Sequence, residues 1–139
     1  MIELFAVPPG EDAAFLAAWT ADPPPGATLY RALREDVPRR FASLASDAPA
    51  GPGGVLLIVP FEVPEGEERR FRAAWEPVRT AFSARRGCLG AVLTDSRDAA
   101  IVAVVHWSSP LMYARAVRDG GDAIAALPFR GHPALYVRA

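Results

Sequence analysis

The chain has 139 residues, of which 51% are hydrophobic and 22% charged, so we expect one compact domain with a substantial core and little disorder. The formal net charge is -1 at pH 7 and the pI is about 6.1, so no excess of positive charge favours nucleic acid or an anionic membrane as a partner. The N-terminal residues show no signal-peptide pattern, and no apolar run approaches the roughly 20 residues that cross a bilayer. We therefore expect a cytoplasmic protein that binds neither nucleic acid nor membrane.

Several residue types are missing from the sequence. It contains no Lys, Asn or Gln, so all 15 basic residues are Arg, no carboxamide can act at a site, and no lysine can form a Schiff base. The single cysteine, Cys88, cannot form an intrachain disulfide and is expected to be a small buried residue. Two His and one Cys give no cluster of metal ligands, and no glycine-rich phosphate loop is present. We expect neither a metal nor a cofactor.

The first strand and helix of the chain occur a second time. Phe5 to Trp19 reads FAVPPGEDAAFLAAW, and Phe61 to Trp75 reads FEVPEGEERRFRAAW. Nine of the fifteen positions are identical, where typical residue usage gives about one by chance. At an offset of 60 the similarity continues, placing Leu29 on Leu89 and Phe41 on Ile101. We interpret this as an internal repeat, with two unrelated similar turns as the alternative, and expect the copies to pack together because so short a unit cannot close its own core.

The first copy is predicted to be a strand, a helix and a hairpin. The helix should bury Phe15, Ala18 and Trp19 on one face. Residues 1–46 thus form a truncated copy, 47–53 a linker, and 54–139 a complete copy, all within one barrel domain. In order, the expected elements are a strand over Ile2 to Val7, a helix over Glu11 to Thr20, and strands over Thr28 to Arg34 and Arg39 to Ala45.

The second copy is predicted to start with an almost continuously apolar strand, Val55 to Val63, of the kind that is buried on both faces. A helix over Glu65 to Arg85 follows, with Pro77 expected to kink or break it near Trp75 and Gly87 as its C-cap. Its apolar stripe consists of Phe71, Trp75, Val78 and Phe82. By its match with Trp19, we predict that Trp75 is structural and does not belong to a site.

A second hairpin and a third helix complete this copy. The hairpin comprises Leu89 to Thr94 and Ala99 to Trp107, with Ile101, Ala103, Val105 and Trp107 on one face and Val102, Val104 and His106 on the other. Ser109 is a good N-cap before Pro110, and the helix should run to about Arg118. Only this copy has the second helix and a last strand, Pro133 to Val137. The order strand, helix, strand, strand, helix, strand predicts an α+β, ferredoxin-like antiparallel sheet, whose second face the first copy would cover.

Four segments in this order resemble the antibiotic biosynthesis monooxygenase (ABM) superfamily: Val59 to Trp75, Gly87 to Leu93, His106 to Pro110, and His132 to Tyr136. The resemblance implies the dimeric α+β barrel fold, in which two such sheets usually meet by homodimerisation. Here one chain could supply both as a pseudo-dimer, and a homodimer is also possible. The superfamily includes cofactor-independent oxygenases that turn anthrones into quinones, haem-degrading enzymes, lactone isomerases and members without known activity.

The resemblance also implies site residues. In the anthrone oxygenases a Trp at the end of the third strand and a Tyr six residues later line the pocket, which here are Trp107 and Tyr113. Those enzymes use an Asn four residues before the Trp, where this chain has Ala103. The haem degraders need an Asn on the first strand and a His in the second helix. This chain has Leu57 and Ile58 on that strand and no match in the Pro110 to Arg118 helix, so neither requirement is met.

We therefore predict a cofactor-free monooxygenase that acts on a small aromatic, polyketide-type molecule. The alternatives are an isomerase or cyclase, or a non-catalytic binding or interaction protein on the same fold. Each candidate also has a structural explanation: core packing for the aromatic residues, a satisfied buried histidine, a strand cap and a solvated arginine. The predicted catalytic residues are Trp107, Tyr113, Arg130 and His132, and the predicted substrate-binding residues are Ala103, Val105, Phe82, Val117 and His106.

Overall fold

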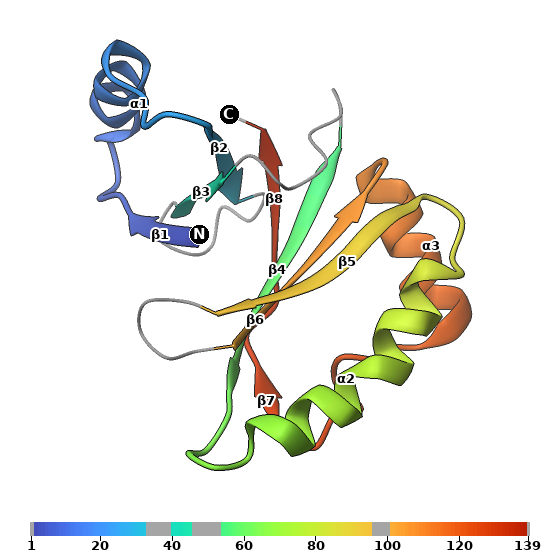
Figure 1. The fold of residues 1–139 in the computed structure, drawn as a ribbon. Coiled ribbons are helices and arrows are strands. Elements are labelled where there is room, and N and C mark those ends of the chain that lie inside the picture. The colour runs from blue at the N-terminus through green and yellow to red at the C-terminus, as the bar shows by residue number, and fades with distance from the viewer. Residues whose placement is uncertain (1, 33–39, 46–53, 96–100, 139) are drawn as a thin grey trace.

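The computed structural model describes residues 2–32, 40–45, 54–95 and 101–138 (Figure 1). The strands form a single sheet in the order β1-β3-β2-β8-β4-β6-β5, and β7 pairs with the far end of β4. The elements are β1 (Ile2–Ala6), α1 (Asp12–Ala21), β2 (Ala27–Ala32), β3 (Arg40–Ala45), β4 (Val55–Glu62), α2 (Glu68–Ser83), β5 (Cys88–Asp95), β6 (Ile101–Trp107), α3 (Pro110–Gly120), β7 (Arg130–Gly131) and β8 (Ala134–Arg138).

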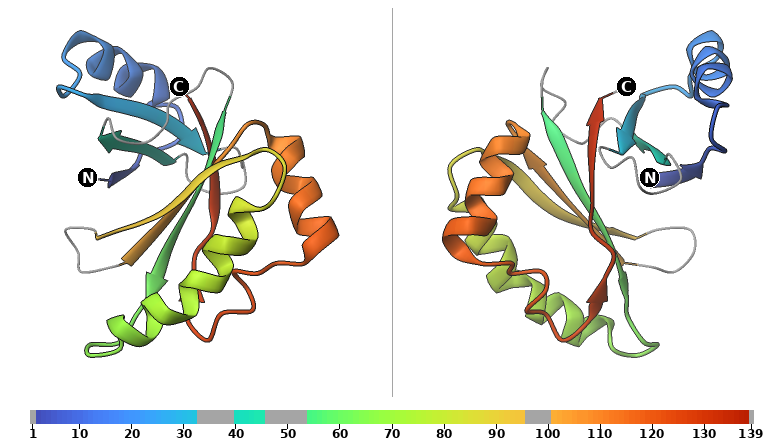
Figure 2. Two further views of the ribbon diagram at one scale, coloured as in Figure 1. Left: turned by 45° about the vertical axis from the view of Figure 1, so that its right-hand side comes forward. Right: turned by 180° about the vertical axis from the view of Figure 1, so that it is seen from behind.

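The second half of the chain has the predicted ferredoxin-like fold. Its strands β8, β4, β6 and β5 lie in that order, and every pairing among them is antiparallel. Helices α2 and α3 lie on the same face of this sheet, as both views in Figure 2 show. The α+β class is confirmed. The loop between β5 and β6 and the linker before β4 lie outside the described residues.

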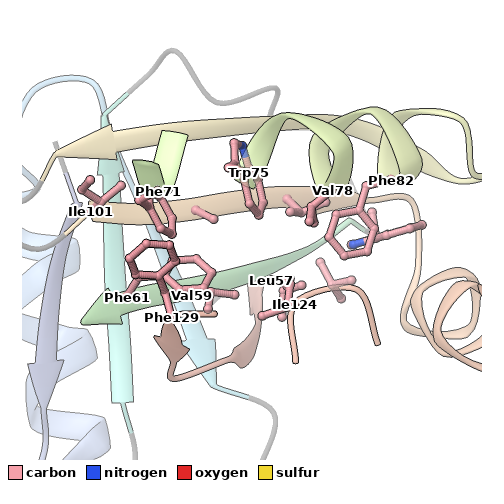
Figure 3. Packing of buried hydrophobic residues seen from close by; sticks show 14 residues of the cluster. Leu57, Val59, Phe61, Phe71, Trp75, Val78, Phe82, Ile101, Ile124 and Phe129 are labelled. Carbon is pink, nitrogen blue, oxygen red and sulfur yellow. The ribbon is translucent and has the colours of Figure 1, made fainter. Parts of the chain in front are cut away.

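Strand β6 divides its side chains between two cores, as its alternation predicts. Ile101, Ala103, Val105 and Trp107 join the cluster under the helices, together with the inward face of β4 (Figure 3). Val102 and Val104 face the other way and pack with Leu56, Ile58, Tyr30 and Tyr136. Because both faces of β4 and β6 are covered, these two strands are apolar along nearly their whole length.

Helix α2 packs on the sheet through the predicted stripe. Phe71, Trp75, Val78 and Phe82 are its buried residues, and they point from the helix into the core in Figure 3. Of the kink or break predicted at Pro77, the break is wrong, because α2 continues through it as one helix. Burial on both sides of the proline holds the helix together despite the lost backbone hydrogen bond. The C-cap is Ala84 rather than Gly87, which lies in the following turn at φ +89°.

The strand-to-helix turns of the two halves have the same geometry. Glu11 N donates to Pro8 O at 3.1 Å, and Glu67 N donates to Pro64 O at 3.0 Å. The N-cap residues Glu11 and Glu67 have φ, ψ of -96°, 2° and -98°, 2°. The glycine before each N-cap has a positive φ, 89° in the first turn and 82° in the second.

The aromatic residues after these turns also match. The Phe5 and Phe15 rings lie 5.4 Å apart and are tilted by 51°, while Phe61 and Phe71 lie 4.8 Å apart at 53°. The Trp rings four residues later, in Trp19 and Trp75, each lie 6.2 Å from the first Phe of their own half, at 69° and 64°. The sequence similarity thus has a close counterpart in side-chain packing.

The two helices differ in how much they bury. Helix α1 has no buried residue, Phe15 and Trp19 are half-buried, and Ala18 is exposed, so the prediction that Ala18 is buried is wrong. The reason is that α1 packs on a small cluster around Val7 and Leu29, whereas α2 packs on the large cluster between the sheet and the helices.

The two halves join along one edge of the sheet. β2 pairs with β8 from Tyr30 to Ala32, which makes one continuous sheet where the sequence suggests two. The pairing supplies hydrogen-bond partners to the free edge of β8. Tyr30 also packs into the cluster on the sheet face opposite α2 and α3, and burial there raises the pKa of its phenol.

Candidate functional site

Trp107 and Tyr113 lie together between the sheet and α3. The Trp107 side chain is fully buried at the end of β6. Its ring makes edge contacts with the rings of Phe82 at 5.8 Å and Tyr113 at 5.9 Å. The Ser109 hydroxyl caps α3 by accepting a hydrogen bond from Met112 N at 3.3 Å, which fixes the start of the helix carrying Tyr113. Three of the predicted site residues are therefore neighbours.

The indole N–H of Trp107 has no hydrogen-bond acceptor among the described residues, although the atom is buried. Leaving such a donor unpaired costs roughly 1–3 kcal/mol, and buried polar groups in native proteins are nearly always paired. A ligand oxygen placed beside Trp107 would satisfy this N–H. Trp75 Nε1 is also buried and unpaired, but its side chain packs with Phe61 in the centre of the core.

Helix α3 covers Trp107 with side chains that are at most half-buried. Helix α3 has no buried residue, whereas α2 buries four. Val117 of α3 is half-buried, while Ala103 and Val105 lie fully buried on the same strand face as Trp107. Because the Trp107 side chain is fully buried, a ligand could reach the indole only if α3 moved outward.

Arg130 and His132 lie at the other end of the sheet. Trp107 pairs with Val55 at the start of β4, while Arg130 pairs with Glu62 at its end. The seven residue steps from Val55 to Glu62 span about 23 Å at 3.3 Å per residue. One small ligand cannot touch both pairs of predicted catalytic residues. The fold thus separates Trp107 and Tyr113 from Arg130 and His132, although all four are predicted to belong to one site.

Glu62 holds this second group together. His132 Nε2 donates to Glu62 Oε1 at 2.8 Å, and Arg130 Nε lies 4.0 Å from the same oxygen. The side chains of Arg130 and His132 are 76% and 48% exposed, so solvent screens these pairs and their contribution to stability is small. Glu62 could not be found from the sequence, because only the long-range pairing of β4 with β7 brings it here.

Two surface hollows, of about 370 and 450 Å³, flank the segment before β7. Phe129 and Arg130 line both, and Glu62, Glu67 and Arg70 line the larger one. The Arg70 guanidinium lies 5.5 Å from the centre of the Phe129 ring, a cation–π contact worth about 0.5–1 kcal/mol at an exposed site. Neither hollow is lined by Trp107 or Tyr113.

His106 lies on the opposite sheet face from Trp107. It is only 3% exposed, and its Nδ1 has no partner among the described residues. A side chain at Gly54 would collide with His106 Nε2, so the glycine makes room for the ring. Burial lowers the pKa of His106, because a charged imidazole would lose its hydration. The sheet separates it from a ligand beside Trp107.

We expect His106 to make the protein less stable as the pH falls. Its folded pKa is below the unfolded value of 6.5, so the unfolded chain binds the proton more readily. The stability lost below pH 6.5 is at most about 1.4 kcal/mol per pH unit, and none of this effect remains well above that pH. Urea unfolding between pH 5 and 8 should show that the free energy of unfolding depends less on pH in His106→Leu than in the parent. Equal slopes in the parent and His106→Leu would contradict this assignment.

The described residues contain no group of three or more His, Cys, Asp or Glu side chains placed to hold a metal ion. In the same part of the chain, no helix is both long and apolar enough to span a membrane.

Comparisons with protein-family models and with curated proteins give no match. Among solved structures, the chain is 27% identical to a presumed monooxygenase from Shewanella loihica PV-4, with a TM-score of 0.55 over 63% of this chain and 95% of that one. SnoaB, a cofactor-independent oxygenase from Streptomyces nogalater, is 20% identical, with a TM-score of 0.53 over 63% of this chain and 94% of SnoaB.

Two structures from Listeria monocytogenes match almost the whole chain at 11% identity. The heme-degrading enzyme LmHde has a TM-score of 0.59 over 100% of this chain and 98% of its own. A ferredoxin-fold protein related to antibiotic biosynthesis monooxygenases has a TM-score of 0.61 over 99% and 93%. At this identity the likeness shows the fold alone, and it includes the first half of the chain. Together, these likenesses and the ferredoxin-like sheet show that the chain has the fold of the monooxygenase-like proteins among these structures.

Proposed function

We propose that this protein is a cofactor-independent oxygenase that acts on a flat aromatic substrate bound beside Trp107, between the sheet and α3. The observation that carries the proposal is the buried indole N–H of Trp107, which has no acceptor among the described residues and lies under a helix that buries none of its residues. The 27% identical monooxygenase-like structure supports the same class of chemistry.

In this proposal the substrate slides between the Trp107 and Tyr113 rings as α3 moves outward. The two rings meet edge to face at 5.9 Å, and a planar molecule would replace that contact with stacking on the indole. The Trp107 N–H and the Tyr113 hydroxyl would then donate hydrogen bonds to substrate oxygens. Both donors favour negative charge on those oxygens, and closure of α3 excludes water.

The reaction follows from stabilising an anion. An anthrone loses a proton from its CH₂ carbon to solvent before α3 closes, and the resulting carbanion then transfers electrons to O₂ and forms a C–O bond. Protonation gives a hydroperoxide. Loss of water from it leaves a carbonyl, so one anthrone and one O₂ give one quinone and one H₂O. Arg130 and His132 have no step here, because they lie about 23 Å away along β4.

The test is oxygen uptake with an anthrone as the substrate. We expect uptake without added flavin, metal or haem, and accumulation of the quinone. Tyr113→Phe and Trp107→Phe each remove one donor and should slow the reaction roughly 10-fold to 100-fold, with an unchanged circular dichroism spectrum. Leu111→Ala is the matched control on α3, because Leu111 is 57% exposed. Variants as fast as the parent would overturn the site assignment, and no uptake by the parent would overturn the activity.

A second function is favoured by the packing around Trp107. Its side chain is sealed, and Ala103 on the same strand face is fully buried with no carboxamide anywhere in the chain. A non-catalytic protein that binds an aromatic molecule fits these facts. It would bind the quinone or anthrone, detected by quenching of tryptophan fluorescence, without consuming oxygen. We do not propose haem degradation, because α3 carries no histidine.

A further inference from the structure

We propose that the chain consists of two repeats and that the first repeat lacks one strand. The unpaired edge of β5 is then a binding site for an extended peptide that takes the place of the missing strand. The repeat is supported by the matching strand-to-helix turns of the two halves and by the matching packing of two Phe rings and one Trp ring after each turn. It is also supported by strand order, since β1-β3-β2 repeats the order β4-β6-β5.

The strand missing from the first half is the counterpart of β8. In the second half β8 does two things: it pairs with β4 from Val55 to Ile58, and it pairs with β2 from Tyr30 to Ala32. It thereby joins the first strand of its own repeat, β4, to the second strand of the other repeat, β2. Among the residues of the first half that the structure describes, none forms such a strand.

The equivalent position lies between β1 and β5. In the described part of the chain, β1 pairs only with β3 and β5 pairs only with β6, so these are the two edges of the sheet. Figures 1 and 2 show the sheet curling, so that β1 comes round toward the end of β5. At the repeat offset of 60, the β2 residues that bind β8 correspond to Gly90, Ala91 and Val92 of β5.

The edge of β5 has the properties of a strand-binding surface. Val92 is 55% exposed and Leu89 is 51% exposed, although both are apolar. Val92 pairs with Val104 and therefore lies on the face opposite α2 and α3. No residue from Cys88 to Thr94 is charged, whereas natural edge strands are usually protected by charges, proline or a covering element.

The occupant that fits is a peptide segment with the chemistry of β8. That strand is extended and uncharged until Arg138, and it alternates between Ala134 and Tyr136 on one face and Leu135 and Val137 on the other. A segment of this kind would add main-chain hydrogen bonds to β5 and place apolar side chains over Val92. A second copy of the chain has no equivalent strand to give, because its own β8 is paired on both edges.

The experiment uses the full chain and a fluorescent synthetic peptide, HPALYVRA, with the sequence of residues 132–139. We expect saturable binding by fluorescence anisotropy and slower hydrogen exchange of the β5 amides in the complex. Val92→Lys should weaken binding roughly tenfold or more, because it places a charge at this binding site. Leu111→Lys is the control, since Leu111 is equally exposed but lies on α3. A scrambled peptide should not bind.

Three results would overturn the proposal. The first is no binding of HPALYVRA, and the second is equal weakening by both lysine variants. The third is light scattering that shows a dimer with β5 amides already protected in the absence of peptide, which would make a second copy the occupant. Both variants should melt at the parent temperature, because the replaced side chains are more than half exposed.

Discussion

Replacing Trp75 by alanine is expected to lower the free energy of unfolding by about 3–5 kcal/mol. The side chain is 1% exposed and lies in the middle of the α2 stripe, with its ring 6.2 Å from that of Phe61. The substitution leaves a large cavity between α2 and the sheet that neighbouring side chains can fill only in part. Urea unfolding monitored by circular dichroism measures the loss.

Trp19→Ala is the matched control, because Trp19 holds the same place in the first half. Its ring lies 6.2 Å from Phe5 in nearly the same orientation, but it is only half-buried and its helix buries nothing. We therefore expect a clearly smaller loss from this substitution. A Trp75→Ala variant that unfolds like the parent but no longer binds an aromatic ligand would show that Trp75 belongs to a site.

Local pattern was enough to predict most elements of the second half. The stripe on α2, the alternation along β6 and the Ser109 cap each depend on neighbours within a few residues, and all three are found. The break at Pro77 was wrong because propensity at one residue is outweighed by burial on either side. Tertiary packing, which the local sequence does not contain, decides that case.

Long-range pairing explains what the sequence could not predict. The pairing of β2 with β8 joins the two halves into one sheet, and the pairing of β7 with β4 places Arg130 beside Glu62. Neither register leaves a periodic signal in the sequence. The prediction of the candidate site is affected most. Trp107 and Arg130 are 23 residues apart in sequence, but they pair with opposite ends of β4. A residue's type indicates its chemistry, but only the register shows which residues share a ligand.

The separation also limits what each end of the sheet can do. At the Trp107 end, buried aromatic rings and an unpaired N–H offer stacking and hydrogen bonding with little charge. At the Glu62 end, exposed ion pairs beside two shallow hollows suit weak contacts with polar groups in water. The proposed oxygenase reaction depends on excluding water, which fits the buried Trp107 end better than the exposed Glu62 end.

The second large loss of stability is expected from a substitution at Gly87, which lies beneath the start of α3. Its φ is +89°, and a Cβ added there would lie 2.5 Å from Met112 Cβ and 3.0 Å from Ser108 Oγ. The left-handed backbone costs a non-glycine residue about 1–2 kcal/mol, and overpacking against α3 adds roughly 1–3 kcal/mol. We expect Gly87→Ala to lower the free energy of unfolding by about 2–5 kcal/mol, measured by urea unfolding.

Gly66→Ala separates these two costs. Gly66 has nearly the same φ, +82°, but nothing lies within 4 Å of its added Cβ, so only the backbone cost of about 1–2 kcal/mol remains. The difference between the two variants then measures how firmly α3 is held against the turn, where Ser108 N donates to Gly87 O at 2.8 Å. If α3 is the movable cover of the Trp107 site, the new methyl group of Gly87→Ala should push it outward at this cost in stability. Gly87→Ala should then also expose Trp107 to acrylamide quenching, whereas Gly66→Ala should not. Equal losses of stability in both variants would mean that α3 shifts without cost, and unchanged quenching would mean that it does not cover the indole.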